Sequence, residues 1–150
     1  MQFIIDKCSQ EDFDDLQKLF LDMFKIFPID QNINYPTTDQ GIAYLNDRIK
    51  NGISFSAKYN QQLVGFIFGS IQKAIPFKTY DKFGFIENLM VNKEFQHQEI
   101  GSGLIESFNN ECKKMGVNVI QTDSDFTQSL VNFYTKNNFK ISGINYIMKI

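Results

Sequence analysis

The residues of this chain whose types and spacing could do chemistry are concentrated between positions 85 and 115. Residues 85–91 form an apolar run typical of a buried strand, residues 92–99 form a polar turn, and Gly101 and Gly103 stand where a helix begins. The first turn of a helix has backbone N–H groups without intrahelical acceptors, and glycines let a ligand approach them closely. Because the positive end of the helix dipole lies at the same place, this segment is a candidate anion site suited to a phosphate.

A helix after this turn is predicted from its buried face and from its ending. Lys113 and Lys114 suit the negative end of the helix dipole, and Gly116 can adopt the left-handed cap. The apolar residues that recur at the spacing of one helical face are Leu104, Ile105, Phe108, Cys112 and Met115.

Composition limits the class of protein. A chain of 150 residues is expected to be one domain spanning residues 1–150, and its 43% hydrophobic residues, 16 Phe among them, supply the core. A net charge of −2 argues against disorder and against a nucleic-acid partner. No apolar run approaches the roughly 18 residues of a membrane span, and the N-terminus lacks the features of a signal peptide. We therefore expect a cytoplasmic protein without a membrane partner.

The two cysteines, Cys8 and Cys112, are predicted to be reduced thiols in the core, because they have neither metal-ligand spacing nor a secreted framework around them. No His/Cys cluster, Walker lysine or dinucleotide-binding glycine motif is present in the sequence. We expect no metal site.

The elements that position residues 85–115 are predicted from the period of the apolar residues. Ser9 is a plausible N-cap, Pro28 should end the first helix, Asn60-Gln61 should form a tight turn, and Asp125 or Thr127 should cap the last helix. Strands are expected at 2–8, 53–59, 62–72, 85–91 and 117–123, helices at 9–27, 42–51, 100–115 and 125–138, and a strand or hairpin at 139–150.

This order, β-α-α-β-β-β-α-β-α-β, predicts an α/β fold with a central mixed sheet flanked by helices. Ligands in such sheets bind beyond the carboxyl ends of strands, where neighbouring strands part. Residues 92–103 lie at such an end.

Two motifs in this framework resemble those of a known family. Residues 91–104 (VNKEFQHQEIGSGL) resemble motif A of the GNAT superfamily of N-acetyltransferases, and residues 133–139 (FYTKNNF) are similar to its motif B, a Tyr followed five residues later by Phe. Together with the element order, the resemblance covers essentially the whole chain. It implies the GNAT fold and acetyl-CoA as co-substrate.

In that family, motif A is Gln or Arg, two residues, Gly, one residue, then Gly or Ala, and its backbone amides hold the pyrophosphate of acetyl-CoA. We prefer the register that places Gln96 first, Glu99 where the family has a glycine and Gly101 last, because it keeps the apolar helix residues on the buried face. A shifted register, Gln98 to Gly101 to Gly103, matches the letters but lengthens the spacing from the strand. We expect Glu99 to supply its backbone N–H from a helical conformation, with its side chain in solvent.

The resemblance also implies which residues contact the coenzyme. Backbone groups of the strand would pair with the pantetheine arm as an added strand would, and Thr127 stands where the family often has an Asn seven residues before the motif tyrosine. His97, the only histidine in the sequence, would either contact a phosphate or be solvated. The predicted set is Leu89, Met90, Val91, Gln96, His97, Gln98, Glu99, Ile100, Gly101, Ser102, Gly103 and Thr127.

Acetyl transfer to an amine requires a neutral nucleophile and a protonated leaving group. An amine of pKa about 10.4 is mostly charged at pH 7, and neutralising it costs about 4.6 kcal/mol. The resemblance points to Glu87 as the general base, although it could instead orient a cationic substrate or pair within the sheet. Tyr134 matches the family's general acid for the departing thiolate, and its alternative role is a core aromatic of the last helix.

Two functions follow from this pattern. The first is an N-acetyltransferase that moves an acetyl group from acetyl-CoA to a primary amine of a small molecule or a protein. The second is a non-catalytic module that binds acyl-CoA or mediates protein interaction, which Glu99 and Asn138 favour because both stand where the family prefers glycine. The sequence leaves the oligomeric state open, a homodimer included.

Overall fold

The structure, a computed structural model, describes residues 2–26, 32–125, 127–143 and 148. Short 3₁₀ turns lie at Gln10–Asp12, Tyr35–Thr37 and Lys93–Phe95. The strands are β1 (Ile4–Lys7), β2 (Ile53–Tyr59), β3 (Gln62–Lys73), β4 (Lys82–Val91) and β5 (Ile120–Thr122), and the helices are α1 (Phe13–Ile26), α2 (Asp39–Asn51), α3 (Ile100–Lys114) and α4 (Gln128–Lys136).

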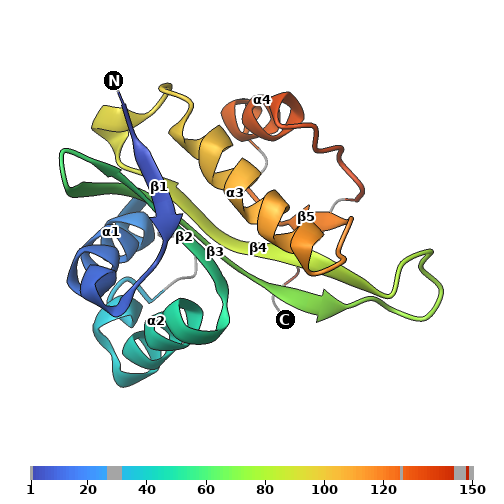
Figure 1. The fold of residues 1–150 in the computed structure, drawn as a ribbon, viewed down its shortest axis with the longest axis horizontal. Coiled ribbons are helices and arrows are strands. Elements are labelled where there is room, and N and C mark those ends of the chain that lie inside the picture. The colour runs from blue at the N-terminus through green and yellow to red at the C-terminus, as the bar shows by residue number, and fades with distance from the viewer. Residues whose placement is uncertain (1, 27–31, 126, 144–147, 149–150) are drawn as a thin grey trace.

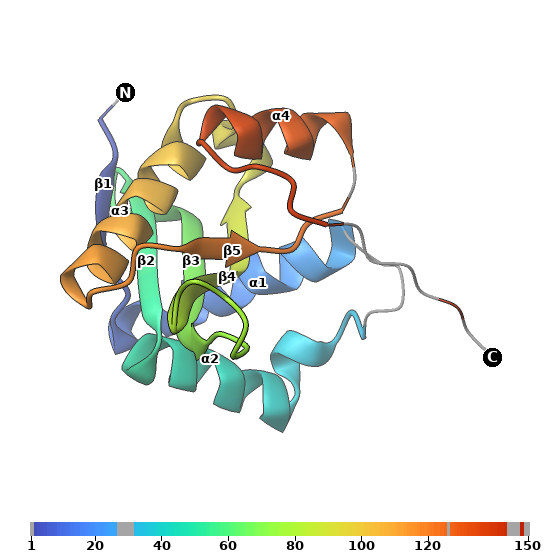
Figure 2. The same ribbon diagram turned by 90° about the vertical axis from the view of Figure 1, so that its right-hand side faces the viewer.

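The five strands form one sheet in the order β1-β2-β3-β4-β5. The first four are antiparallel to their neighbours, and β5 is parallel to β4, so the predicted mixed sheet is confirmed. Helices α1 and α2 cover one face, and α3 and α4 cover the other (Figures 1 and 2). The order of elements matches the prediction as far as α4.

The last predicted element, a strand or hairpin at 139–150, lies largely outside the described residues. Residues 139–143 are described and carry no strand. The predicted end of the first helix at Pro28 also falls outside the described ranges.

Each face of the sheet has its own hydrophobic core. Phe108 of α3 packs with Ile67 and Ile86 on one face, whereas Phe20 of α1 packs with Phe66 on the other. All five side chains are buried, and each contributes roughly 1.5–3 kcal/mol by leaving water.

Both cysteines are free and buried, as predicted. Burial raises the pKa of the Cys8 thiol to about 12, with partial relief from the Ser54 hydroxyl. Burial likewise raises the pKa of Cys112 to about 11. Neither thiol is ionised at neutral pH.

The start of α1 is tied to the sheet through Asp12. Ser9 caps the segment as predicted, and its backbone N–H donates to the Asp12 carboxylate (2.8 Å), which also pairs with Lys58 of β2 (2.5 Å). Burial raises the pKa of Asp12, but the Lys58 ammonium and the Ser9 donors outweigh it and leave the pKa below its usual value.

Replacing Asp12 by Asn is expected to lower the free energy of unfolding at neutral pH by about 2 kcal/mol, because it leaves Lys58 without its partner. A lowered pKa stabilises the fold above the unfolded value of about 3.9, and this contribution is lost as pH falls through the folded pKa. The difference in free energy of unfolding between wild type and Asp12→Asn, measured in urea, should therefore disappear below about pH 4. Asp15→Asn, at an exposed pair with Lys18, is the control and should change little. An equal loss in both variants would contradict this role of Asp12.

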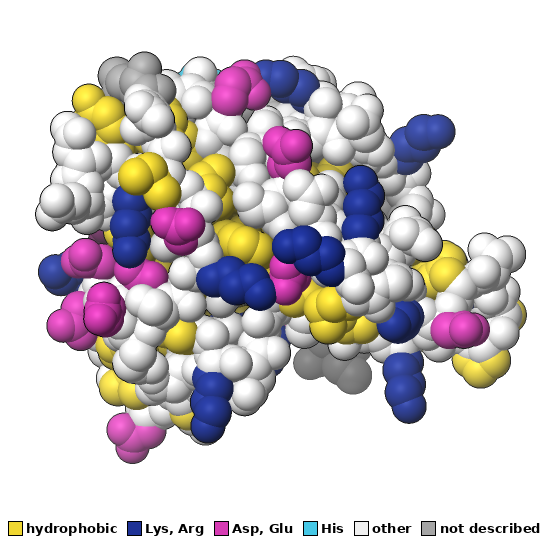
Figure 3. All heavy atoms as spheres, viewed as in Figure 1, with side chains coloured by type: hydrophobic (Ala, Val, Ile, Leu, Met, Phe, Trp, Pro, Cys, Tyr) yellow, Lys and Arg dark blue, Asp and Glu magenta, His cyan; other side chains and the backbone are white. Residues whose placement is uncertain are grey.

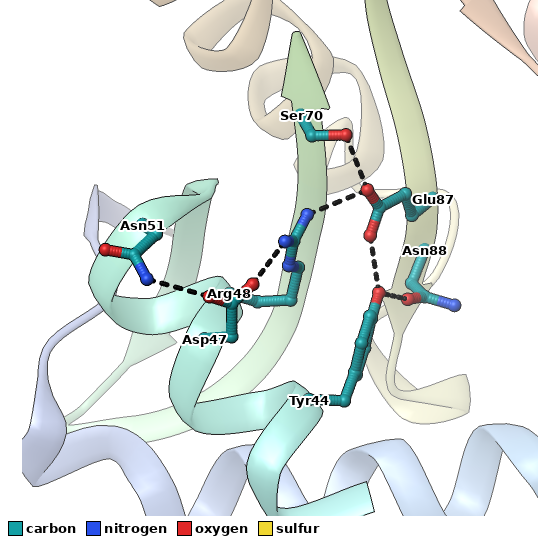
Figure 4. A network of polar contacts seen from close by, with 7 residues as sticks. All are labelled: Tyr44, Asp47, Arg48, Asn51, Ser70, Glu87 and Asn88. Carbon is teal, nitrogen blue, oxygen red and sulfur yellow. Dashed lines mark hydrogen bonds and ion pairs between the residues drawn. The ribbon is translucent and has the colours of Figure 1, made fainter. Parts of the chain in front are cut away.

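A β-bulge interrupts the pairing of β3 with β4. Phe68 pairs with Asn88 and Gly69 pairs with Ile86, so Glu87 is the extra residue. The bulge lets Glu87 and Asn88, neighbours in sequence, both face α2 (Figure 4). Gly69 has no room for a side chain, because a Cβ there would lie 2.3 Å from the Phe85 carbonyl oxygen.

Strands β4 and β5 pair over a short distance only. Their pairing covers residues 84–86 of β4, which continues to Val91 without a described partner on that side. The two strands therefore part beyond Ile86, beneath α3 and α4 (Figure 1). This is where the sequence predicts a ligand site.

The surface has two further features. On the face shown in Figure 3, acidic and basic side chains are interspersed without a large field of one sign. The β3–β4 hairpin projects beyond the sheet (Figure 1), and Phe77 in its turn is 81% exposed. Among the described helices, none is long and apolar enough to cross a membrane.

Candidate active site

A cleft of about 450 Å³ lies where β4 and β5 part, between the N-terminus of α3 and one side of α4. Nine of the predicted residues line it: Leu89, Val91, Gln96, His97, Glu99, Ile100, Gly101, Ser102 and Tyr134. Six more line it that were not assigned from the sequence: Phe95, Ser129, Leu130, Asn132, Phe133 and Lys136.

The edge of β4 presents free backbone groups to this cleft. Asn92 N–H donates to Val64 O of β3 (2.8 Å), so by strand alternation Leu89 and Val91 direct their backbone groups away from β3. Val91 O accepts a hydrogen bond from Gln96 Nε2 (3.1 Å), which holds the turn against the strand. An extended ligand could pair with the rest of this edge.

Met90 differs from its two neighbours. Alternation directs its backbone toward β3, and its side chain is buried on the α1 face, beside Leu19. It does not line the cleft, so the expectation that it contacts the coenzyme has no support in the geometry.

The N-terminus of α3 opens into the cleft. Gly103 N–H makes the first hydrogen bond of the helix, to Glu99 O (2.9 Å), so the N–H groups of the three preceding helical residues have no acceptor within the helix. Gly101 stands beside Phe133 of α4, where a Cβ would lie 3.0 Å from the Phe133 ring, so the two walls of the cleft come close together there.

The expectation of a helical Glu99 is wrong. Glu99 is the N-cap of α3 with φ 65° and ψ 6°, in the left-handed region that favours glycine. Glycine adopts this conformation without strain, so the geometry fits the register that places Glu99 at the glycine position of the motif, from Gln96 to Gly101. His97, two residues earlier, also has a positive φ of 61°. The turn therefore holds two non-glycine residues in a conformation that L-amino acids disfavour.

Besides Met90 and Glu87, three predicted residues lie outside the cleft lining. Gln98 donates to the Glu94 carbonyl oxygen at 3.4 Å, within its own turn. Gly103 faces β1, where a Cβ would lie 2.8 Å from Ile5 Cδ1. Thr127 caps α4, its hydroxyl accepting from Leu130 N–H at 3.3 Å. These contacts give Gln98 and Thr127 local structural roles.

Tyr134 of α4 borders the cleft and packs between two aromatic rings, with centroids 5.1 Å from Phe133 and 5.4 Å from Phe139. Burial raises the pKa of its hydroxyl, and the Thr122 side chain offsets part of this shift. Tyr134 is therefore a neutral phenol at pH 7, the protonation state of a proton donor.

Glu87 lies on the opposite face of the sheet, in a polar network with α2 (Figure 4). Its Oε1 accepts from Arg48 Nη1 (2.8 Å) and from Ser70 Oγ (2.6 Å), and its Oε2 accepts from Tyr44 (2.7 Å). Burial and the Glu87 carboxylate raise the pKa of Tyr44, which stays protonated as the donor. Because three donors engage the carboxylate, the geometry fits pairing within the fold better than proton removal from a substrate.

The network continues on both sides of Glu87. Tyr44 Oη also lies 2.7 Å from Asn88 Oδ1, and Arg48 pairs with Asp47, which accepts from Asn51 Nδ2 (2.7 Å; Figure 4). A hydroxyl has one proton, so when Tyr44 donates to Glu87 the Asn88 amide must present its N–H to Tyr44.

Sequence signals existed for some of the missed residues. Tyr44 and Arg48 stand one helical turn apart beside the apolar stripe of α2, a spacing that places both on one flank. Ser129, Asn132 and Lys136 follow the helical period along the cleft side of α4. Which flank of each helix would meet the site could not be derived from these spacings.

The described residues contain no group of three or more His, Cys, Asp or Glu side chains placed to hold a metal ion.

The sheet is mixed, and its fourth and fifth strands part beside an open helix N-terminus, so the chain is an α/β protein with a cleft at that point. The family model described as the acetyltransferase (GNAT) family matches residues 13–139. The chain therefore belongs to the GNAT acetyltransferase family. No curated protein matches it in sequence.

Solved structures share the fold over the whole chain. A predicted acetyltransferase from Clostridium acetobutylicum, solved with acetyl-CoA, has a TM-score of 0.81 at 17% identity and covers 99% of this chain and 96% of its own. A transcriptional regulator from Bacillus halodurans C-125 has a TM-score of 0.80 at 18% identity, covering 99% and 100%. The aminoglycoside N-acetyltransferase AAC(6')-Iy, in complex with a bisubstrate analogue, has a TM-score of 0.80 at 14% identity, covering 100% and 99%. At these identities the likeness is one of fold.

Proposed function

We propose that this protein is an acetyl-CoA-dependent N-acetyltransferase that acts on a primary amine of a small molecule or a protein. The observation that carries the proposal is the cleft, which combines a free β4 edge, an open helix N-terminus and a neutral tyrosine. Family membership supports the reaction class, and the acetyl-CoA and bisubstrate complexes of the fold neighbours support the co-substrate.

The coenzyme would occupy the cleft from the N-terminus of α3 to Tyr134. The pyrophosphate would accept hydrogen bonds from the N–H groups of residues 100–102, where the helix dipole favours an anion. The pantetheine amides would pair with the Leu89 and Val91 backbone as an added strand does. The thioester would then lie near Ile86, where the two strands part.

In the reaction, the amine nitrogen forms a bond to the thioester carbonyl carbon, and the C–S bond breaks as the tetrahedral intermediate collapses. The coenzyme leaves as a thiolate, and Tyr134 donates its phenolic proton to that sulfur. The acceptor ammonium loses one proton to solvent before the attack, and the nitrogen loses a second proton after it, which returns to the Tyr134 phenolate through solvent. We propose that Glu87 is a positioning residue that holds Arg48 and Tyr44 against β4.

The decisive experiment follows free thiol while the protein, acetyl-CoA and a panel of primary amines are incubated together, with calorimetry for CoA binding. Amine-dependent thiol release supports the proposal. Absence of both thiol release and CoA binding would overturn it. CoA binding without thiol release for any amine would favour the non-catalytic module, for which Glu99 at the glycine position is the supporting observation.

Asn138 supports that alternative less than the sequence implied. Its φ is 66°, and asparagine tolerates the left-handed region. Phe139 N–H donates to Tyr134 O (3.0 Å), which closes the end of α4 in the way a glycine cap would.

The pH dependence of turnover distinguishes the two roles of Glu87. If solvent takes the amine proton, kcat/KM should rise about tenfold per pH unit toward the acceptor pKa of about 10.4. Glu87→Gln should keep this slope and lower the melting temperature, because Arg48 then retains only Asp47 as an anionic partner. Glu106→Gln, an exposed carboxylate on α3, is the control. A large loss of kcat/KM at neutral pH that recovers as the pH rises, in Glu87→Gln but not in Glu106→Gln, would identify Glu87 as the base.

A further inference from the structure

Glu99 is a carboxylate at a position where the proposed function brings in a phosphate. It is the N-cap of α3, next to the three N–H groups without intrahelical acceptors, and it lines the cleft. A carboxylate there could itself bind the helix N-terminus, as acidic caps commonly do, or repel an incoming anion. Glu99 does not cap: its side chain makes no hydrogen bond to the helix N–H groups.

The side chain of Glu99 turns instead across the cleft. Its Oε1 lies 2.5 Å from Lys136 Nζ, on the opposite wall formed by α4. The Lys136 ammonium, with a smaller effect from the Ser102 hydroxyl, lowers the pKa of Glu99, so the carboxylate is charged and paired at neutral pH. The pair therefore both diverts the carboxylate from the helix N-terminus and neutralises its charge.

We propose that Lys136 is a positioning residue for coenzyme binding, which holds Glu99 away from the N-terminus of α3 so that the pyrophosphate can bind there. The proposal rests on the proposed function and deepens it. A residue other than glycine can stand at this motif position because a partner from α4 removes its side chain from the anion site. Lys136 acts through Glu99 and makes no contact with the coenzyme.

The alternative arrangement would have Lys136 bind a coenzyme phosphate directly. The two arrangements differ in one respect that can be measured. A positioning role needs Glu99, so removing the Glu99 side chain removes the need for Lys136. A direct contact does not depend on Glu99. A double-mutant cycle therefore separates them.

The experiment measures the Kd for CoA by calorimetry in wild type, Lys136→Met, Glu99→Gly and the double variant, at about 0.1 M salt. Lys136→Met should weaken CoA binding about tenfold in wild type and less than about twofold in the Glu99→Gly background. The weakening should shrink at about 1 M salt, because both side chains are more than 60% exposed and salt screens such charges. Lys140→Met, an exposed lysine outside the cleft lining, is the matched control.

Dephospho-CoA provides the second arm. Because the helix N-terminus would bind the pyrophosphate, Lys136→Met should weaken dephospho-CoA as much as CoA. An effect that disappears with dephospho-CoA would assign Lys136 to the 3′-phosphate and overturn the proposal. Equal weakening in both Glu99 backgrounds, or none in either, would also overturn it. If wild type binds no CoA, the proposed function is refuted together with this inference. If wild type binds CoA but the effects of the Lys136 and Glu99 substitutions on the Kd are additive, only this inference is refuted.

Discussion

Replacing Tyr134 by Phe is expected to lower kcat by about 100-fold or more and to leave the Kd for CoA unchanged. The change keeps the ring between Phe133 and Phe139 and removes only the hydroxyl, so the packing of α4 is preserved. Burial keeps that hydroxyl protonated at neutral pH. Its loss removes the proton donor for the departing thiolate while leaving the binding contacts in place. Single-turnover kinetics, which follow thiol release directly, measure the effect.

Tyr80→Phe is the matched control for this prediction. Tyr80 accepts a hydrogen bond from Gln121 Nε2 (2.7 Å) and lies outside the cleft lining, so removing its hydroxyl should leave kcat within about twofold. The general-acid role of Tyr134 would be refuted by near-normal single-turnover rates in Tyr134→Phe. If kcat and CoA affinity fell together, Tyr134 would instead belong to the binding surface.

Replacing Gly69 by Ala is expected to lower the free energy of unfolding by about 3 kcal/mol, the upper end of the usual range for overpacking. The new Cβ would lie 2.3 Å from the Phe85 carbonyl oxygen and 2.4 Å from Phe108 Cε2. A backbone oxygen cannot move aside without shifting β4, so the strain must spread into the bulge that carries Glu87. Urea unfolding followed by circular dichroism measures the loss.

Gly143→Ala is the control for this substitution, since no atom of the described residues lies within 4 Å of a Cβ at that position. Its unfolding midpoint should match that of wild type. A Gly69→Ala variant with wild-type stability would show that β3 and β4 can separate locally at the bulge. In that case the clash would not determine which residue stands at this position.

The site itself was only partly predictable. The residues of the α3 turn follow a local motif, and six of them lie in the cleft: Gln96, His97, Glu99, Ile100, Gly101 and Ser102. Leu89 and Val91, from the strand before the turn, also lie there. The predicted role of Glu87 as a base did not take into account the hydrogen bonds that its carboxylate accepts in the fold. No local pattern indicates them, because Tyr44 and Arg48 are 43 and 39 residues away in sequence and Ser70 is 17.

The sequence by itself determined the elements and their order. The apolar period of α1 and α3, the cap at Ser9 and the turn at Asn60-Gln61 are properties of neighbouring residues, and local preferences favour them before any long-range contact forms. Tertiary structure alone decided the bulge at Glu87, because an extra residue in one strand is defined only against the register of its partner. It likewise decided the left-handed conformation of Glu99 and its pairing with Lys136, since helix α4, which carries that lysine, reaches the N-terminus of α3 only when both pack on the same face of the sheet.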